Sequence, residues 1–305
     1  MHRPVLLQET INYLVTDPNG TYVDCTVGGG GHLSHLRECL GENAQLIALD
    51  RDYETLQATR NKLNYENITF IHEDFRHLAE ILEKLNIAEV HGIILDLGVS
   101  SMQLDNAIRG FSYHEDGPLD MRMDTNQALT ARDIVNNYSE DDISRILYSF
   151  GEEKYARRIA RSIVKYRQEK AIISTLDLVN IIKSSVPARY TREKHPARRS
   201  FQALRIAVNG ELDALQEVLP AACDKLITGG RLCIITFHSL EDRIVKQFIR
   251  EKAKKCICPP SFPVCTCGHK ASIRILTRKP VIPGEDELNC NPRARSAKLR
   301  VVEKL

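Results

Sequence analysis

The residues best suited to chemistry in this chain are carboxylates that end short apolar segments. Asp50 and Asp96 each follow such a segment, and Asp24 shortly precedes four consecutive glycines, Gly28 to Gly31. Glycines let a ligand approach the backbone closely, and a carboxylate can accept hydrogen bonds from both hydroxyls of a ribose. Together they predict a nucleotide-like ligand, whereas a glycine run alone would be more typical of a flexible loop.

The spacing of the glycines separates two classes of nucleotide site. A dinucleotide site has the pattern Gly-x-Gly-x-x-Gly, and here Gly28 and Gly30 fit the first two positions while the third falls on Leu33. With Asp24 before the turn and His32 after it, the stretch resembles the first motif of S-adenosylmethionine-dependent methyltransferases with a Rossmann-like fold. A nicotinamide-dependent dehydrogenase is therefore the weakest alternative.

Alternating strand and helix patterns position these residues. Seven segments have strand character: 21–25, 46–50, 68–72, 90–95, 231–237, 272–276 and 297–302. Helical patterns lie between them, at 33–40, 53–63, 78–85, 201–226 and from 238 to 249. The pattern predicts an α/β fold with a parallel sheet and helices on both faces, and ligands of such sheets bind at the carboxyl ends of the strands. Asp74 and Phe75 fall at that edge as well, where the ring of Phe75 could flank an adenine or simply be part of the core.

Helical periodicity dominates the middle of the chain. Apolar residues recur at helical spacing over 130–136, 140–150, 153–169 and 175–184. We therefore expect the sheet domain, residues 1–106 and 206–305, to be interrupted by a helical insertion, residues 107–205, that recognises the substrate.

Charge is distributed unevenly along the 305 residues. The net charge is only +2, but residues 151–205 hold 14 Lys and Arg against 5 Asp and Glu, and residues 243–305 hold 15 against 5. The remainder is acidic, so the two basic segments predict a polyanionic partner, most plausibly nucleic acid, rather than only solvated helix faces. The residues expected to hold phosphates are Arg157, Arg161, Lys165, Arg198, Arg199, Arg293 and Arg295.

Longer motifs point to one family. The sequence resembles the bacterial 16S ribosomal RNA methyltransferases that methylate the 4-amino nitrogen of a decoding-centre cytidine. The matching stretches lie at residues 2–7, 28–32, 96–105, 109–112, 117–124, 151–153, 195–205, 237–243 and 291–296, in order along nearly the whole chain.

The resemblance implies a Rossmann-like methyltransferase domain with an inserted helical domain, S-adenosylmethionine as cofactor, and 16S ribosomal RNA or the small ribosomal subunit as partner. It implies that cofactor contacts come from Gly28, Gly30, Gly31, His32, Asp50, Phe75, Asp96 and Gln103. Two alternatives remain. One is an amino-group methyltransferase that acts on another nucleic acid such as DNA, and the other is a non-catalytic ribosome-assembly factor.

For the chemistry, we expect Asp96 near the reacting centre, with His238 or Asp242 beside the base. A carboxylate that accepts a hydrogen bond from an exocyclic amine favours the pyramidal nitrogen of the transition state. The alternative is that Asp96 contacts only the methionine moiety of the cofactor.

Four of the nine cysteines are close together in the loop 256–269 and are not among the family's motifs. Cys256, Cys258, Cys265 and Cys267 could bind structural zinc, although their Cys-x-Cys spacing differs from the usual Cys-x-x-Cys, and reduced thiols in a surface loop are the alternative. No apolar segment resembles a signal peptide or a membrane span, so we expect a cytoplasmic protein. The oligomeric state stays open.

Overall fold

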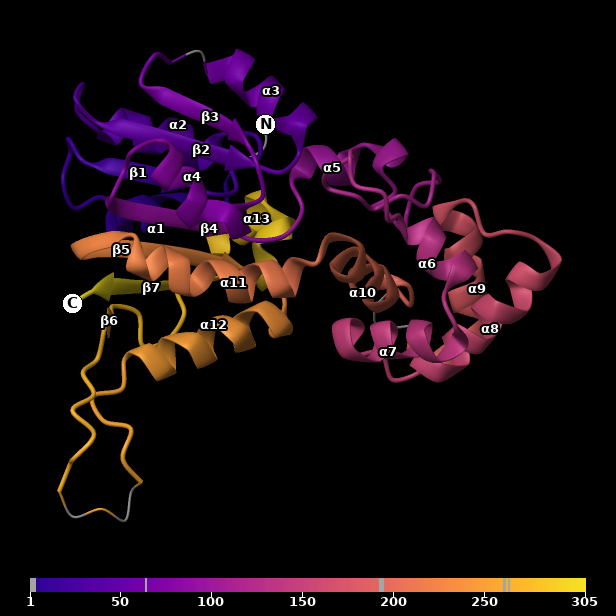
Figure 1. Cartoon of the computed structure of the whole chain (residues 1–305). Helices are drawn as coiled ribbons and strands as arrows, with labels where there is room; N and C mark the ends of the chain where they lie inside the picture. Colours follow the sequence, from indigo (N-terminus) through magenta and orange to yellow (C-terminus); the bar gives the residue numbers. More distant parts are fainter. Residues whose placement is uncertain (1–3, 64, 192–194, 260–261, 263) are drawn as a thin grey trace. The chain divides into compact units, whose positions relative to one another are not determined.

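The computed structural model describes residues 4–63, 65–191, 195–259, 262 and 264–305. His2 and Arg3 of the first family motif, and residues 192–194 of the first basic segment, lie outside this part of the chain. The chain divides into two compact units: residues 1–98 with 212–305, and residues 99–211 (Figure 1). The first holds the sheet and the second is helical.

The first unit is built on a seven-stranded sheet in the order β3-β2-β1-β4-β5-β7-β6. The strands are β1 (Thr21–Asp24), β2 (Gln45–Asp50), β3 (Ile68–His72), β4 (Val90–Asp96), β5 (Leu226–Thr236), β6 (Ile273–Ile275) and β7 (Lys298–Lys304). The first five pair in parallel, while β7 runs antiparallel to both β5 and β6. The predicted α/β Rossmann-like fold is confirmed, but the expected parallel sheet is mixed at the β7 and β6 end.

Helices cover both faces of the sheet, because successive residues of a strand point to opposite sides. On β4, Ile93 and Leu95 pack with helices α4 (Leu78–Lys84), α11 (Glu211–Asp224) and α12 (Ser239–Lys252). Ile94 packs on the other face, with α1 (Leu7–Leu14), α2 (Gly31–Cys39) and α3 (Tyr53–Leu63). The continuous apolar run of β4 is therefore that of a strand buried on both faces. A short helix near the end of the chain, α13 (Glu285–Cys290), belongs to the same unit.

The second unit has its own apolar core. It contains α5 (Ser101–Asp105), α6 (Ala131–Asn137), α7 (Glu140–Gly151), α8 (Ala156–Glu169), α9 (Thr175–Ser185) and α10 (Arg198–Asn209). Ile143, Leu147, Ile159 and Ile163 are completely buried in it, which follows from their helical spacing. Asn209 links α10 to an irregular segment, accepting from the backbone N–H of Met123 at 2.8 Å.

Two expectations differ from the structure. The helix expected over 201–226 is broken into α10 and α11 because Gly210 is in the left-handed conformation, with φ 60°, and ends α10. The units divide at residues 98/99 and 211/212 rather than at 106/107 and 205/206, because Val99 and Leu104 pack on the core of the second unit and α10 belongs to it throughout. In the described residues, no helix is both long and apolar enough to cross a membrane.

Candidate active site at the carboxyl ends of the strands

The glycine turn follows β1, where the sheet order reverses between β1 and β4 and parallel sheets commonly bind ligands. Gly28 and Gly30 have φ of 48° and 74°, values that residues with a Cβ rarely adopt. The Gly30 N–H donates to the Val27 carbonyl at 2.8 Å, and α2 begins at the next residue. The turn thus exposes backbone at a helix N-terminus, as the sequence predicted.

Space around the turn differs from one glycine to the next. A Cβ on Gly30 would lie 2.6 Å from Thr59 Cγ2, and one on Gly31 would lie 2.1 Å from Pro4 Cγ. A Cβ on Gly29 would meet nothing within 4 Å. Two of the glycines are therefore required by packing, while Gly29 leaves open space in which a ligand could approach the backbone.

Asp50, at the end of β2, shapes the turn that it is predicted to serve. Its carboxylate accepts from the N–H of Gly28 and from the N–H of Asp52, both at 2.8 Å. Burial raises the pKa of Asp50 to about 6 even though these two N–H donors lower it. Each carboxylate oxygen has further lone pairs, so both can still accept hydrogen bonds from ribose hydroxyls.

Asp96 lies at the end of β4, in surroundings that strongly disfavour its ionised form. Burial raises its pKa well above the usual range, and the charges of Asp24 and Glu241 raise it further. Its Oδ1 is buried and has no hydrogen-bond partner in the part of the chain that the structure describes. Its Oδ2 lies 3.5 Å from Nδ1 of His32, whose Nε2 is 3.0 Å from the Val5 carbonyl.

Asp24, the last residue of β1, and Thr26, two residues further on, connect the end of β1 to the backbone of Asp96. Asp24 is 1% exposed, and burial raises its pKa to about 7. It accepts from the Thr26 N–H at 3.0 Å, and Thr26 Oγ1 in turn accepts from the Asp96 N–H at 2.7 Å. The sequence indicated Asp24 as part of the turn, but not Thr26 as the link between two strand ends.

Glu241 was missed by the sequence analysis. It is 2% exposed and accepts from the N–H groups of Phe237 and His238, at 2.7 and 3.2 Å. His238 is the N-cap of α12 and closes a capping box with Glu241, its Nε2 lying 3.0 Å from Glu241 Oε1. The spacing of a capping residue and a glutamate three positions later was a signal that could have found this carboxylate.

Asp242 has strong partners within its own unit. Its carboxylate accepts from Lys298 Nζ at 3.0 Å and from Arg300 Nε at 2.8 Å, both on β7. Burial raises its pKa, but the hydrogen bonds and charges of Arg300 and Lys298 outweigh this and lower it overall. The arrangement stabilises the contact between α12 and β7, which gives Asp242 a structural role.

Phe75 and Gln103 are on different units. Phe75 opens a short 3-10 helix after β3 and packs partly against the α4 side of the sheet. Gln103 is 4% exposed in the helical unit, where its Oε1 accepts from the Ser100 N–H at 3.0 Å in a capping box that starts α5. A contact of Gln103 with the cofactor stays a prediction.

The predicted phosphate-binding residues are mostly exposed. Arg157, Arg161 and Lys165 lie at i, i+4 and i+8 on α8, opposite its buried Ile159 and Ile163. Arg161 also lies 3.5 Å from Glu140.

Two further pairs of predicted phosphate-binding arginines lie on other elements, and three of these four residues are exposed. Arg198 is exposed at the start of α10, and Arg199 donates to the Glu152 carbonyl at 2.9 Å. In the sheet unit, Arg293 and Arg295 are exposed on a short 3-10 helix, Pro292–Ser296.

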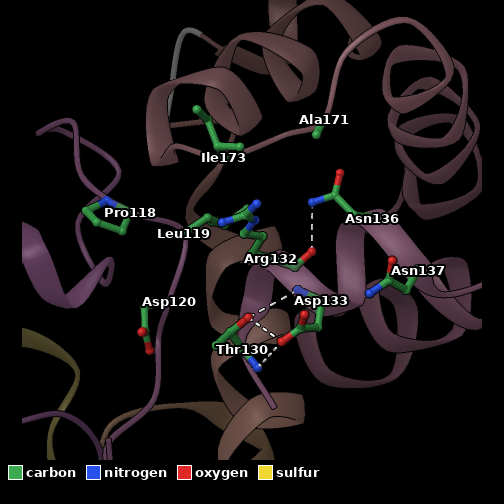
Figure 2. A pocket seen from close by; sticks show the side chains of 10 residues that line it. All are labelled: Pro118, Leu119, Asp120, Thr130, Arg132, Asp133, Asn136, Asn137, Ala171 and Ile173. Atoms are coloured by element: carbon green, nitrogen blue, oxygen red, sulfur yellow. Dashed lines mark hydrogen bonds between the residues drawn. The ribbon is translucent and has the colours of Figure 1, made fainter. Parts of the chain in front are cut away.

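A cavity of about 550 Å³ lies within the helical unit, between the segment at Pro118 to Asp120 and helix α6 (Figure 2). Its polar groups largely serve the fold: Asn136 bonds the Ile172 backbone in both directions, and Thr130 and Asp133 form a helix cap. None of the predicted site residues lines it.

The strand-end residues fit a cofactor that combines a ribose with a positive charge. The buried Asp96 Oδ1 would gain a partner, and a cation would relieve the repulsion among Asp24, Asp96 and Glu241. S-adenosylmethionine, which carries a sulfonium, an amino group and a ribose, has the required charge and hydroxyls. The residues that would hold it are those of the glycine turn with Asp50 and Asp96.

Comparisons with known proteins show which family the chain is similar to. The model of the MraW methylase family matches residues 1–305. A relative from Heliobacterium mobile named "Ribosomal RNA small subunit methyltransferase H" is 52% identical over 308 residues, covering 100% of this chain and 99% of its own. One of the same name from Halothermothrix orenii is 50% identical, covering 100% and 98%. The structure of an rRNA methylase from Streptococcus thermophilus aligns over 100% of this chain and 99% of its own, at 12% identity and a TM-score of 0.44.

Substitutions in the glycine turn separate packing from ligand approach. Gly30→Ala should lower the free energy of unfolding by about 1–3 kcal/mol, because the left-handed φ and the contact with Thr59 both oppose a Cβ. Gly29→Ala should change it by less than about 0.5 kcal/mol, yet weaken S-adenosylmethionine binding. Denaturant unfolding and calorimetric titration would measure the two quantities. Unchanged affinity in Gly29→Ala would show that the cofactor does not lie against this residue.

Proposed function

Since the chain belongs to the MraW methylase family, we propose that it transfers a methyl group from S-adenosylmethionine to the 4-amino nitrogen of a decoding-centre cytidine in 16S ribosomal RNA. Membership makes the protein an S-adenosylmethionine-dependent methyltransferase, and the proposal concerns its acceptor. The small ribosomal subunit or its RNA is then the partner, and the bacterial cytoplasm is the place of action.

One structural observation carries the cofactor part of this proposal. Asp96 lies at the end of a parallel strand, next to the glycine turn, and its pKa is raised. One of its buried oxygens has no hydrogen-bond partner among the described residues. A buried carboxylate in such surroundings is costly, and sites of this kind are commonly functional. A positively charged ligand is the partner that would make its ionised form favourable.

The cofactor supplies a methyl group already activated on a positively charged sulfur. The chain's own residues then have to align the acceptor and exclude water. When the amine nitrogen gains the methyl group it must lose one proton, and a carboxylate that accepts a hydrogen bond from that amine assists the change. We assign this role to Asp96 as a hypothesis and expect His238 beside the base, while Asp242 pairs with Lys298 and Arg300.

The basic residues support an RNA substrate. Arg157 and Lys165 on α8 are exposed and have the spacing of a continuous basic face, and Arg293 and Arg295 are exposed on the sheet unit. Side chains of this kind hold phosphates and position a nucleic acid without reading its sequence. The target base must also be unstacked, since an amine inside a helical stack cannot reach an active site.

Two alternatives make different predictions about the product. A DNA methyltransferase would label DNA, and a non-catalytic assembly factor would bind the cofactor without turnover. Small-subunit RNA, assembled small subunits and DNA should each be incubated with labelled cofactor, and the product nucleotide mapped by mass spectrometry. We expect N4-methylcytidine at one position of 16S RNA, present with the protein and absent without it. Label in DNA only, or no product, would reject the proposal.

The raised pKa of Asp96 predicts pH-dependent cofactor binding. In the free protein its carboxyl holds a proton at a pH where an ordinary aspartate does not, and a cationic ligand favours the ionised form. Affinity for S-adenosylmethionine should therefore increase as pH rises, by up to about tenfold per unit for one released proton. S-adenosylhomocysteine, which lacks the sulfonium charge, should show a smaller dependence.

Asp96→Asn tests both the binding and the chemistry. The variant should bind the cofactor with a flatter pH profile, while Asp24 and Asp50 keep their own contribution. It should also be more stable than the parent at neutral pH, because a folded-state pKa above the unfolded value means that stability is lost as pH rises. Undiminished turnover of the variant at saturating cofactor would remove Asp96 from the chemistry.

The phosphate assignment predicts a change in salt dependence. Arg157→Ala with Lys165→Ala should weaken RNA binding and reduce the slope of log affinity against log salt by about 1.4 to 1.8. Arg60→Ala with Lys84→Ala is the matched control, since both residues are exposed but lie outside the proposed basic surfaces. An unchanged slope in the first variant would contradict the assignment.

A further inference from the structure

A long loop, residues 253–272, connects α12 to β6 in the sheet unit. Its two ends are held together by a hydrogen bond from the Ser272 N–H to the Lys252 carbonyl at 3.0 Å. Beyond that bond, Ile257, Phe262 and Val264 are 61%, 54% and 71% exposed. Apolar side chains that remain in water cannot fix the conformation of a loop, so another interaction has to do so.

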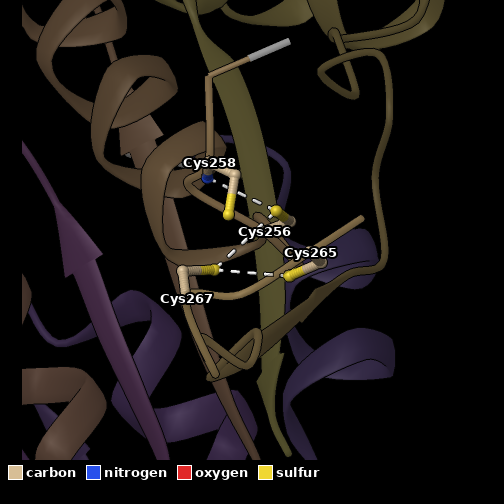
Figure 3. Close-up of side chains that lie close together, drawn as sticks. All are labelled: Cys256, Cys258, Cys265 and Cys267. Atoms are coloured by element: carbon tan, nitrogen blue, oxygen red, sulfur yellow. Dashed lines mark hydrogen bonds between the residues drawn. The ribbon is translucent and has the colours of Figure 1, made fainter. Parts of the chain in front are cut away.

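Four cysteines gather in this connection (Figure 3). One sulfur from each of Cys256, Cys258, Cys265 and Cys267 lies within 4.8 Å of all the others. The separation is 3.5 Å from Cys265 to Cys267 and 3.7 Å from Cys267 to Cys256. A disulfide would need about 2.0 Å, so these sulfurs are neighbours without being bonded.

The two shortest sulfur–sulfur separations are close to the edge length of a metal-centred tetrahedron. Zinc–sulfur bonds are about 2.3 Å long, and a tetrahedron of that radius has edges of roughly 3.8 Å. The Cys-x-Cys spacing is unusual for zinc, but in this loop it still brings the four sulfurs within 4.8 Å of one another. Two such pairs facing one another supply four ligands from two segments.

One backbone hydrogen bond lies within the cluster, and three lysines flank it in sequence. The Cys258 N–H donates to Cys256 Sγ at 3.3 Å. Lys254, Lys255 and Lys270 flank the cluster in sequence and are exposed. Four thiolates around a divalent cation carry a net charge of about −2, which such N–H donors and lysines stabilise.

We propose that Cys256, Cys258, Cys265 and Cys267 bind one structural zinc ion that holds the connection between α12 and β6 in shape. All four positions of a tetrahedral ion are filled by the protein, so the ion has no open position for a substrate. Zinc takes no part in methyl transfer and the site is independent of the proposed RNA substrate. The alternative is a group of four reduced thiols, which would hold no stoichiometric metal.

Metal content of the full chain, purified without chelators, is the direct measurement. We expect about one zinc per chain by elemental mass spectrometry, and loss of it in Cys256→Ser with Cys267→Ser. The control is Cys39→Ser with Cys290→Ser, because both cysteines are exposed and lie outside the cluster. Cobalt added to the metal-free protein should produce the thiolate-to-metal charge-transfer and ligand-field bands of a tetrahedral sulfur site.

Limited proteolysis tests the structural role without relying on activity. Removing zinc should accelerate tryptic cleavage at Lys254, Lys255 and Lys270 while S-adenosylmethionine binding is retained. Absence of stoichiometric zinc together with no cobalt spectrum would overturn the proposal, as would iron in place of zinc or disulfides within the cluster. The wild-type measurements decide the matter even if the cysteine variants fold poorly.

Discussion

Parallel pairing of β1, β2 and β4 forces three carboxylates onto one edge of the sheet, and the rest of the site depends on that constraint. Asp24, Asp50 and Asp96 end these strands, and Glu241 adds a fourth charge from the start of α12. Burial raises the pKa of all three aspartates. Neighbouring carboxylates add to this, Asp50 for Asp24, Asp52 for Asp50, and Asp24 with Glu241 for Asp96, so the free protein holds the three at a cost to stability. A ligand with positive charge would lower that cost, which is the basis for proposing that the cofactor binds at these strand ends.

The same carboxylates also build the backbone around them. Asp50 accepts from the N–H of Gly28 and so holds the glycine turn, while Thr26 connects Asp24 to the Asp96 backbone. Residues that would hold the cofactor are therefore positioned by hydrogen bonds within the fold. This arrangement keeps the site preorganised, because little has to move for the cofactor to be bound.

On our proposals, substrate recognition and loop stability depend on other parts of the chain. The helical unit has a separate apolar core and presents Arg157 and Lys165 on a face opposite Ile159 and Ile163. The connection after α12 exposes its apolar side chains and gathers four sulfurs instead. The helical unit is stabilised by burial of apolar side chains, whereas the connection after α12 is, on our proposal, stabilised by metal ligation.

Local pattern by itself determined the elements and the class of site. The apolar periodicity of 53–63 and the alternation at 68–72 correspond to α3 and β3 residue for residue, because neighbouring residues set both patterns. The glycines, Asp50 and Asp96 were recognisable because strand ends in a parallel sheet share one edge. Only the tertiary structure decided that β7 is antiparallel, that Gly210 divides a helix, and that Asp242 pairs with Lys298 and Arg300. It also decided that Glu241 is buried and that one Asp96 oxygen has no partner within the residues the structure describes, since burial and long-range pairing depend on residues far apart in the chain.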